Sequence, residues 1–334
     1  MPTLHVTELL SNRCGHCNTL LTTLHHCTSA CHVQTYCSEA HLTLDRAVHT
    51  STCQAIVDAQ RKRSESEAAL RSSNPEIFNC GHGHGHFWEL EETRDYVDAR
   101  MGLVNALGCV NNRISDSTRL MHLEDLISLC RTDLIGLREE IPDVLLRLGQ
   151  DQECYDFIVW WTRAGKALNR GWDGNEETQP FLDTRVADVF ESLESCFGVM
   201  EEASTQHLLD VLLIKVRLLL DARQLLRLPQ SPQATDAEIR VLSHITAARH
   251  SSITPEVAER LADQIKTLHR AVHGRNEFFW DVFLNYDATV LQEAEDLKFP
   301  FGTGTRQEAL LMLKKHLPAW KDTPGAFDVV GDGR

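Results

Sequence analysis

The first 53 residues of this 334-residue chain contain six of its 11 cysteines, and their spacing limits the possible folds more than any other feature. With two histidines they form four pairs, whose members are separated by two or three residues. Such a spacer lets one short turn present both side chains to one metal ion, and Zn²⁺ binds thiolate sulfur and imidazole nitrogen at the corners of a tetrahedron. Eight ligands are enough for two closed zinc sites. The pairs are Cys14 with Cys17, Cys27 with Cys31, Cys37 with His41, and His49 with Cys53.

The composition is that of a soluble globular protein. Hydrophobic residues make up 42% of the chain and charged residues 24%, and the length is typical of about two domains. No apolar run reaches the ~18 residues of a membrane-spanning helix, because charged side chains interrupt the most apolar segment, 208–220. The N-terminus has no basic stretch followed by an apolar core, so no secretory signal is expected. We therefore expect an intracellular protein, cytoplasmic or nuclear, whose clustered cysteines bind metal rather than form disulfides.

The charge balance argues against nucleic acid as a partner. The net charge is −15, and proteins that bind nucleic acid need a basic surface to neutralise phosphates. The densest basic run, 61–63, is flanked by Glu65 and Glu67, which favours the solvent-facing side of a helix; a nuclear-localisation signal is the alternative. We expect neither a nucleic-acid nor a membrane partner.

The sequence pattern divides the chain into three segments. The metal-binding segment covers 1–56, a helix and a flexible linker fill 57–86, and a helical domain spans 87–330. The linker helix is polar and is expected at 54–71, ending before the proline at position 75. The metal-binding segment should therefore be a small module ahead of a larger helical domain.

A glycine-rich loop follows the linker helix and carries Cys80, His82, His84 and His86. Three imidazoles and a thiol can bind a metal ion. Alternating glycines do not hold these ligands in place, however, so a flexible loop with only adventitious metal binding is the favoured interpretation.

Beyond this loop the sequence predicts helices. Apolar residues recur at steps of three and four, the period of an amphipathic helix. The segment 208–220 is apolar almost all round, so its helix should lie in the middle of the domain. No part outside the metal-binding segment shows the alternation of a β-strand. The prediction is a mainly α protein, with a two-zinc finger followed by an irregular helical-repeat or superhelical domain; a compact bundle is the alternative. Later helical stripes lie at 186–197, 208–226, 239–248, 257–272, 278–284 and 307–317.

The ligand spacing, with Tyr36-Cys37-Ser38 at the third pair, resembles the MYND-type zinc finger. In that family the pairs interleave, so that the first and third share one zinc ion and the second and fourth share the other. Interleaving would cross-link a segment too short to bury a core, so metal binding would supply its folding energy. The resemblance implies Cys14, Cys17, Cys37 and His41 as ligands of one ion, and Cys27, Cys31, His49 and Cys53 as ligands of the other.

Two positions depart from the family pattern. The second pair, Cys27 with Cys31, has a spacer of three where the family usually has two, and the sixth ligand is His41 followed by Leu42 where the family has Cys followed by Gln. Histidine is an acceptable zinc ligand, so the first site should persist with one thiolate fewer. The glutamine and aromatic residue that border the family's peptide groove are absent, so binding of proline-rich peptides does not carry over. Nearby histidines are alternative ligands: His16, His25, His26 and His32.

The remaining chain resembles the helical region of MYND-finger proteins of filamentous fungi. This resemblance covers most of the chain but implies little about function, because that family is mostly known by its finger. It rests on the segments 92–107 (ETRDYVDARMGLVNAL), 131–161 (RTDLIGLREEIPDVLLRLGQDQECYDFIVWW) and 319–330 (AWKDTPGAFDVV).

The sequence leaves three functional hypotheses. We favour a non-enzymatic adaptor, whose finger docks a protein partner through a peptide and whose helices offer a second surface. The second is an enzyme, either a relative of the SET-type lysine methyltransferases or of an unrecognised class. The chain lacks the Asn-His-x-Cys segment of a SET domain, and no nucleophile elbow, P-loop or dinucleotide motif occurs. The third is a finger that only caps the helical domain. No catalytic or cofactor-binding residue is assigned.

Overall fold

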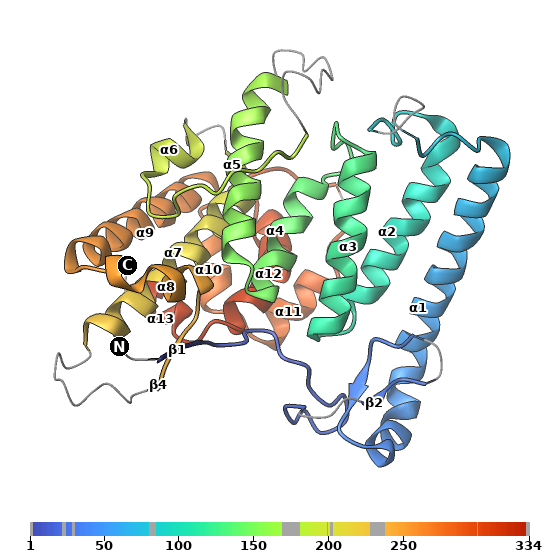
Figure 1. Ribbon diagram of the computed structural model, residues 1–334, viewed down its shortest axis with the longest axis horizontal. Coiled ribbons are helices and arrows are strands. Elements are labelled where there is room, and N and C mark those ends of the chain that lie inside the picture. Colours follow the sequence, from blue (N-terminus) through green and yellow to red (C-terminus); the bar gives the residue numbers. More distant parts are fainter. Residues whose placement is uncertain are drawn as a thin grey trace. The chain divides into compact units, whose positions relative to one another are not determined.

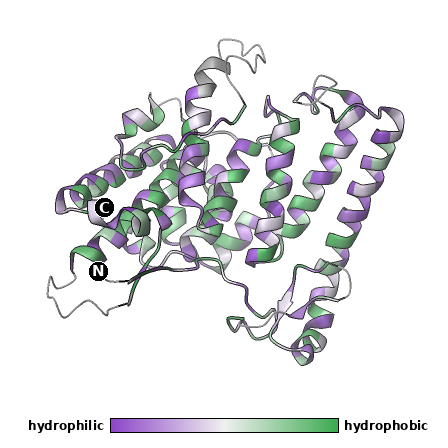
Figure 2. Cartoon of the chain, viewed as in Figure 1, coloured by the Kyte–Doolittle hydropathy of each residue, from purple (hydrophilic) through white to green (hydrophobic). Residues whose placement is uncertain are grey.

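A computed structural model confirms that the protein is mainly α-helical (Figure 1). Among the described residues, four short strands form two sheets of two strands each. Most helices carry both hydrophobic and hydrophilic residues (Figure 2), as expected for helices that pack on one side. The structure describes residues 3–21, 25–28, 31–79, 85–168, 181–198, 200, 203–227, 238–298 and 300–331.

The chain divides into two compact units. The finger unit covers Leu10–Val144, and the C-terminal unit combines Met1–Leu9 with Leu145–Arg334. The boundary lies within helix α4 (Leu137–Leu148). The metal-binding segment thus shares one unit with the helices that follow it, whereas the sequence divides the chain into three segments. Which of these segments folds independently stays a prediction.

The described part of the finger unit contains three complete helices, the first part of α4 and a hairpin. Helix α1 (Glu39–Ser73) packs on α2 (Arg94–Gly108), which packs on α3 (Arg113–Leu129). The hairpin pairs β2 (His25–His26) with β3 (Thr35–Tyr36) in antiparallel order. A short 3₁₀ turn, η1 (Glu91–Thr93), leads into α2.

Helix α1 begins earlier than the linker helix predicted at 54–71. The side chain of Ser38 accepts a hydrogen bond from the backbone amide of His41 at 3.2 Å and so caps the helix. No proline or glycine occurs between Glu39 and Ser73, and Pro75 follows the C-cap residue Asn74. The helix therefore starts inside the metal-binding segment and continues far beyond it.

The core of the finger unit contains cysteines as well as apolar side chains. Cys27, Cys31 and Cys53 are buried in one cluster with Ile56 of α1 and Leu107 of α2. Removing these groups from water stabilises the packing of the hairpin on the helices. The metal-binding segment therefore shares a core with α1 and α2.

Helix α7 (Thr205–Leu226) is the central element of the C-terminal unit, as its apolar sequence predicts. It contacts helices from both earlier and later parts of the chain. These are α5 (Asp151–Leu168), α8 (His244–Arg249), α9 (Pro255–Arg275), α12 (Arg306–Lys321) and α13 (Ala326–Gly331). The remaining elements are α6 (Leu193–Phe197), η4 (His250–Ser252), α10 (Phe279–Leu284) and α11 (Ala288–Glu295).

The charged side chains in the middle of α7, from Asp210 to Asp221, are buried and have partners. The guanidinium of Arg217 donates to the carboxylate of Asp151 at 2.5 Å, and Asp210 lies 3.2 Å from the Nδ1 atom of His316. The Lys215 ammonium donates to the backbone carbonyl of Val189. A buried charge without a partner is costly, so these contacts let charged residues occupy a central helix.

Two predictions about the C-terminal unit are wrong. A parallel sheet joins β1 (Thr3–Val6) to β4 (Glu238–Val241), so the predicted helix at 239–248 begins as a strand and only α8 is helical there. In the predicted helix 186–197 only α6 is α-helical. Both stretches are short and held by contacts distant in sequence, which override local periodicity.

None of the helices in the described part of the chain is both long and apolar enough to cross a membrane.

Candidate metal centre

One face of α1 presents a row of polar side chains at intervals of four residues. His41, Asp45, His49 and Cys53 lie on this face, because residues four apart are neighbours on a helix surface. His49 and Cys53 are close enough to contact one ion. His41 is eight residues before His49, or about 12 Å along the helix, and so belongs to a different cluster. The helical spacing itself separates the two sites.

Two loops bring the other ligands to this helix. At the first pair, the backbone amide of Asn18 donates to the carbonyl of Cys14 at 2.8 Å, which closes a tight turn around Cys14 and Cys17. Asn18 adopts a left-handed conformation there, with φ of 57°. In the hairpin, Cys27 donates its amide to the carbonyl of Gln34 at 2.8 Å, while Cys37 directly follows β3.

The first cluster consists of Cys14, Cys17, Cys37 and His41. The Sγ atoms of Cys17 and Cys37 are 3.8 Å apart, and Nδ1 of His41 lies 3.6 Å from Sγ of Cys14. Nδ1 of His41 is 3.0 Å from Sγ of Cys37. Cys14 is buried, Cys17 is exposed, and the other two are half-buried. This cluster is therefore partly open to solvent.

The second cluster consists of Cys27, Cys31, His49 and Cys53, all of them buried. The Sγ atoms of Cys27 and Cys53 are 3.7 Å apart, and Nε2 of His49 lies 3.2 Å from Sγ of Cys31. The two histidines thus offer different ring nitrogens, Nδ1 in the first cluster and Nε2 in the second. The second cluster belongs to the core of the finger unit.

Both clusters have the chemistry and size of a zinc site. A Zn–S bond is about 2.3 Å, so two sulfurs at corners of a tetrahedron should be about 3.8 Å apart. The sulfur pairs at 3.8 Å and 3.7 Å match that edge. Within each cluster all ligand atoms lie within 4.8 Å of one another. Three cysteines and one histidine are a usual ligand set for structural zinc, so the residues fit the ion that the sequence predicts.

Cys14 of the first cluster and Cys31 of the second differ in acidity, while burial raises the pKa of Cys37 in the first cluster as well. Burial alone would raise the pKa of Cys14, but hydrogen bonds from the backbone amides of Cys17, Cys37 and His16 lower it to about 7. In the second cluster burial raises the pKa of Cys31 to about 12. Because thiolate is the form that binds zinc, the metal must displace a proton from Cys31 at neutral pH.

Burial also acts on the histidine of the second cluster. It lowers the pKa of His49, and the nearby Asp45 carboxylate opposes that effect. A neutral imidazole is the form that ligates metal. The buried ring of His49 is thus kept in its ligating form.

A buried hydrogen bond supports the ligand helix. The Tyr36 hydroxyl donates to Oδ2 of Asp45 at 2.9 Å, and both residues are buried. Tyr36 precedes the ligand Cys37, and Asp45 lies midway between His41 and His49 on α1. The bond therefore ties β3 to the ligand-bearing face of the helix. Asp45 is not among the residues predicted from the sequence, although its position four residues from each histidine is a signal for it.

Asn112 ties the loop of the second cluster to α3. Its side chain donates from Nδ2 to the backbone carbonyl of Val33 at 2.9 Å, and its Oδ1 accepts from the amide of Ser115 at 2.9 Å. The second contact caps α3, where Asn is a favoured residue. One buried side chain thus fixes both the loop after Cys31 and the start of a helix.

The alternative histidines lie outside both clusters. His16, His25, His26 and His32 belong to neither group. Nδ1 of His26 is 3.2 Å from the backbone oxygen of His32, and the ring of His16 lies 4.8 Å from that of His41. His16 is therefore the closest substitute for His41.

Most of the glycine-rich loop lies outside the described residues, Cys80, His82 and His84 included. His86 is described and exposed, with Nδ1 located 3.1 Å from the carboxylate of Glu89.

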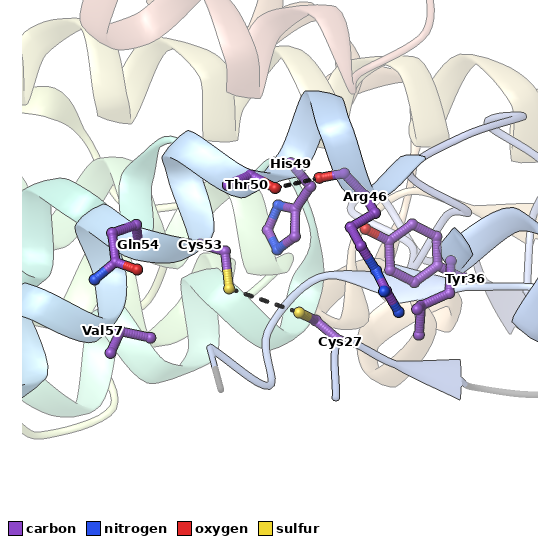
Figure 3. A pocket seen from close by; sticks show the side chains of 9 residues that line it. Cys27, Tyr36, Arg46, His49, Thr50, Cys53, Gln54 and Val57 are labelled. Carbon is purple, nitrogen blue, oxygen red and sulfur yellow. Dashed lines mark hydrogen bonds between the residues drawn. The ribbon is translucent and has the colours of Figure 1, made fainter. Parts of the chain in front are cut away.

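A pocket of about 140 Å³ adjoins the second cluster. Figure 3 shows Cys27, His49 and Cys53 beside it, with Arg46 and Tyr36 at one side and Gln54 and Val57 at the other. Leu42 and Thr50 complete the lining. The pocket therefore combines an apolar surface with one exposed cation, Arg46, next to two candidate ligand thiols.

Comparison with models of protein families gave no match for this chain, and comparisons with curated proteins and with solved structures gave none either. The functional argument therefore depends on the two clusters and their surroundings.

Proposed function

We propose that residues 10–56 form a MYND-like finger with two zinc ions. One observation carries this proposal: the eight paired ligands gather into two tetrahedron-sized groups, and each group combines alternate pairs of the sequence. Interleaved pairs are the arrangement that the resemblance implies. In this assignment His41 takes the place of a cysteine, so both ions have three thiolates and one imidazole. Bound zinc would supply a positive charge that stabilises the clustered thiolates.

Zinc stoichiometry tests the proposal directly. Elemental analysis and native mass spectrometry of purified, untagged protein should give two zinc ions per chain. A single tightly bound ion would contradict the interleaved assignment, and a third ion that survives mild chelation would point to the loop that contains His86.

For the whole protein we propose a non-enzymatic, intracellular adaptor role, in which the finger docks a segment of a partner protein. The pocket beside the second cluster supports this role. Its lining by Leu42, Tyr36 and Val57 suits an apolar side chain, and the exposed Arg46 suits an acidic group on the same segment. Because the pocket shares a wall with the zinc ligands, its shape depends on a folded finger.

An affinity pull-down read by mass spectrometry tests this docking. Wild type, Cys53→Ser and Arg46→Glu are compared, with Arg61→Glu as the matched control, because Arg61 is exposed on the same helix outside the pocket. Partners that are kept by wild type and Arg61→Glu, and lost in the other two, support the proposal. Equal recovery with all four proteins contradicts it.

The enzyme hypothesis remains the alternative. A SET-type catalytic core is mostly β-structure, whereas the described strands are two to four residues long. Buried groups with shifted acidity do occur in the C-terminal unit: burial lowers the pKa of Lys215 to about 8 and raises that of Cys196 to about 11. Both side chains are fully buried. A methyltransferase assay with labelled S-adenosylmethionine tests this alternative.

A further inference from the structure

The finger unit contains another pocket, separate from the one beside the candidate zinc ligands. It has a volume of about 310 Å³ and is lined by side chains of three packed helices, α1, α2 and α3, together with Phe78 from the turn after α1. The two pockets have no lining residue in common. About 300 Å³ is the lower end of the range for small-ligand sites. This pocket can therefore hold a small group rather than a length of chain.

Three arginines line this pocket, although the chain as a whole is acidic. Arg63 and Arg71 come from α1, and Arg100 comes from α2. Among the described residues that line the pocket, the carboxylates are those of Glu67 and Asp125. At neutral pH the lining thus has three positive and two negative charges, in a protein whose net charge is −15. An excess of one charge in a concave surface concentrates ions of the opposite charge.

Glu67 is shared by two of these arginines. Its carboxylate lies 2.9 Å from Nη2 of Arg71 and 3.5 Å from Nη1 of Arg63. The Arg71 guanidinium also lies over the ring of Phe78, 4.1 Å from the ring centroid, where a cation–π contact helps to hold it. One carboxylate cannot neutralise two guanidiniums, so a positive charge remains on the α1 side of the pocket.

Arg100 is a buried cation that is incompletely compensated. Its side chain is 6% exposed, whereas its carboxylate partner, Asp125, is 60% exposed, so water weakens the pair. Nη1 donates to the Tyr96 hydroxyl at 2.8 Å, and Nη2 donates to Oδ2 of Asp125. Within the described part of the chain these two are its hydrogen bonds, although a guanidinium has five N–H donors. Each terminal nitrogen of Arg100 therefore has one more hydrogen to donate, and a buried charge is costly until it is fully paired.

A nearby histidine responds to the same positive charges. His122 of α3 is buried, and its pKa is lowered to about 4, first by burial and then by the charges of Arg100 and Arg63. The charge of Asp125 opposes this shift but is the weakest of these influences. The arginines therefore dominate the local potential even beside their carboxylate partner.

The lining selects the kind of anion. A phosphomonoester has a charge of about −1.5 to −2 at neutral pH and three acceptor oxygens, so it suits three guanidiniums better than a single carboxylate does. Arginine also binds phosphate through two parallel N–H groups. The rings of Phe78 and Tyr96 and the side chain of Leu129 border the same pocket. The group that carries the phosphate should therefore be aromatic.

We propose that this pocket binds an aryl phosphomonoester, the chemistry of a phosphotyrosine side chain or of a small aromatic phosphate. The phosphate oxygens accept hydrogen bonds from Arg63, Arg71 and Arg100, and the exposed Asp125 turns to solvent when they bind. The aromatic ring packs against Phe78. The pocket shares no residue with either candidate zinc site, so the proposal does not depend on the zinc-binding or docking proposals.

Isothermal titration calorimetry of the full-length protein with phenyl phosphate tests the proposal. Phenyl phosphate should bind, and added salt should weaken binding, because salt screens exposed charges. Benzoate, which has the same ring and one charge fewer, should bind about two- to fivefold more weakly. No binding of phenyl phosphate, or equal binding of the two anions, would overturn the proposal.

A phosphotyrosine peptide identifies the source of the ligand. If the peptide binds more tightly than phenyl phosphate, the pocket takes a phosphorylated side chain of a protein. If the two bind equally, the pocket takes a small aromatic phosphate. Both results support the proposed chemistry, whereas equal binding of the unphosphorylated peptide contradicts it.

Charge variants of α1 locate the binding site. Arg63→Gln/Arg71→Gln should weaken binding of phenyl phosphate about tenfold, because each partly exposed ion pair contributes about two- to fivefold. The matched control is Arg61→Gln/Lys62→Gln, which removes two exposed cations of the same helix outside the pocket and should bind as wild type does. If the control weakens binding as much as the pocket variant, general attraction of an anion to α1 explains the result and the proposal is wrong.

Asp125→Asn separates a binding role of Arg100 from a purely structural one. The change removes the carboxylate that competes with the ligand, so phenyl phosphate should bind about twofold more tightly, although the free protein loses a buried ion pair. The rise in melting temperature on adding phenyl phosphate should therefore exceed that of wild type. Circular dichroism checks that the variant is folded. Unchanged or weaker binding in the folded variant would mean that Arg100 and Asp125 serve only the fold, and would overturn the proposal.

Discussion

The two candidate zinc sites have the same ligand set but different surroundings. The first, with Cys14, Cys17, Cys37 and His41, has an exposed thiol, whereas all four ligands of the second are buried. All three cysteines of the second site pack in one cluster with Leu103 and Leu107 of α2, whereas Cys14 is the only ligand of the first site that is buried in this cluster. The first site therefore closes a surface loop on the start of α1, and the second joins the hairpin to the core. Equal ligand chemistry does not imply an equal contribution to stability.

The largest expected effect comes from removing a thiol of the second site. Cys31→Ser should lose one zinc and lower the free energy of unfolding of the finger unit by several kcal/mol, because metal binding in small fingers is worth about 10 kcal/mol or more. Cys17→Ser should also lose one zinc but destabilise the unit less, since its thiol is exposed. Zinc content and urea unfolding followed by circular dichroism measure both effects.

The control for this pair is Cys109→Ser. Cys109 is an exposed cysteine of the same unit and belongs to neither cluster. Its replacement should leave two zincs and an unchanged unfolding curve. If Cys17→Ser destabilised the protein as much as Cys31→Ser, the contrast between a surface site and a core site would fail.

A second prediction concerns the histidine of the first site. His41→Ala should lose one zinc or bind it much more weakly, while His41→Cys should keep both and leave the fold intact, because cysteine is an equally good ligand. Metal analysis after dialysis against a mild chelator distinguishes the two variants. Two zincs at unchanged affinity in His41→Ala would mean that another imidazole replaces it. The ring of His16, 4.8 Å away, is the first to test, in a double variant.

The pH dependence of zinc binding should differ between the sites. Zinc displaces thiol protons, so affinity rises by about tenfold per pH unit for each proton displaced, and stops rising once the pH exceeds the thiol pKa. For Cys14, with a pKa of about 7, this gain should end near neutral pH, and in the first site only Cys37, whose pKa burial raises, should extend it. For Cys31, with a pKa of about 12, it should continue through alkaline pH.

Competition with a chelating indicator dye between pH 6.5 and 9 measures this difference. Cys17→Ser protein reports the second site alone, and wild type reports both, so the first site follows by comparison. The second site should show the steeper slope above neutral pH. Parallel slopes would show that burial does not control the acidity of its thiols.

The smallest expected effect comes from removing the Tyr36–Asp45 hydrogen bond, which ties β3 to the ligand-bearing face of α1. Tyr36→Phe removes the hydroxyl that donates to Asp45 and should cost about 1–3 kcal/mol, because the buried carboxylate loses that donor. Both zincs should remain, since no ligand changes. Thermal unfolding together with zinc content tests this. Loss of one zinc at neutral pH would show that the hydrogen bond positions the ligands of that site rather than only stabilising α1.

The ligands were predictable because their signal is local. Cys37 lies four residues from His41, and His49 lies four residues from Cys53. This is about one helical turn, so spacing alone indicates that each pair can meet one ion. The alternation of the pairs between two ions came from the resemblance, and the helical rise from His41 to His49 gives its physical reason. The buried position of α7 was likewise predictable from the sequence, because a helix that is apolar on all sides is stable only inside the unit.

Contacts between distant residues were not predictable in the same way. Nothing near Thr3 indicates that its strand pairs with Glu238, and four residues are too few to show a reliable alternation. The sequence also does not show that Asn112 holds the loop at Val33, or that Asp45 accepts from Tyr36. Each of these depends on how elements pack after they form.

By itself, the sequence determined the set of eight candidate ligands, the mainly helical class and the central place of α7. Those features depend on spacing and periodicity, which act over a few turns of chain. Only the tertiary structure decided that one site is open and the other buried, because burial depends on which side chains of α2 cover the hairpin. It also decided that the buried Arg217 of α7 pairs with Asp151 of α5, because local spacing does not link two residues so far apart in sequence.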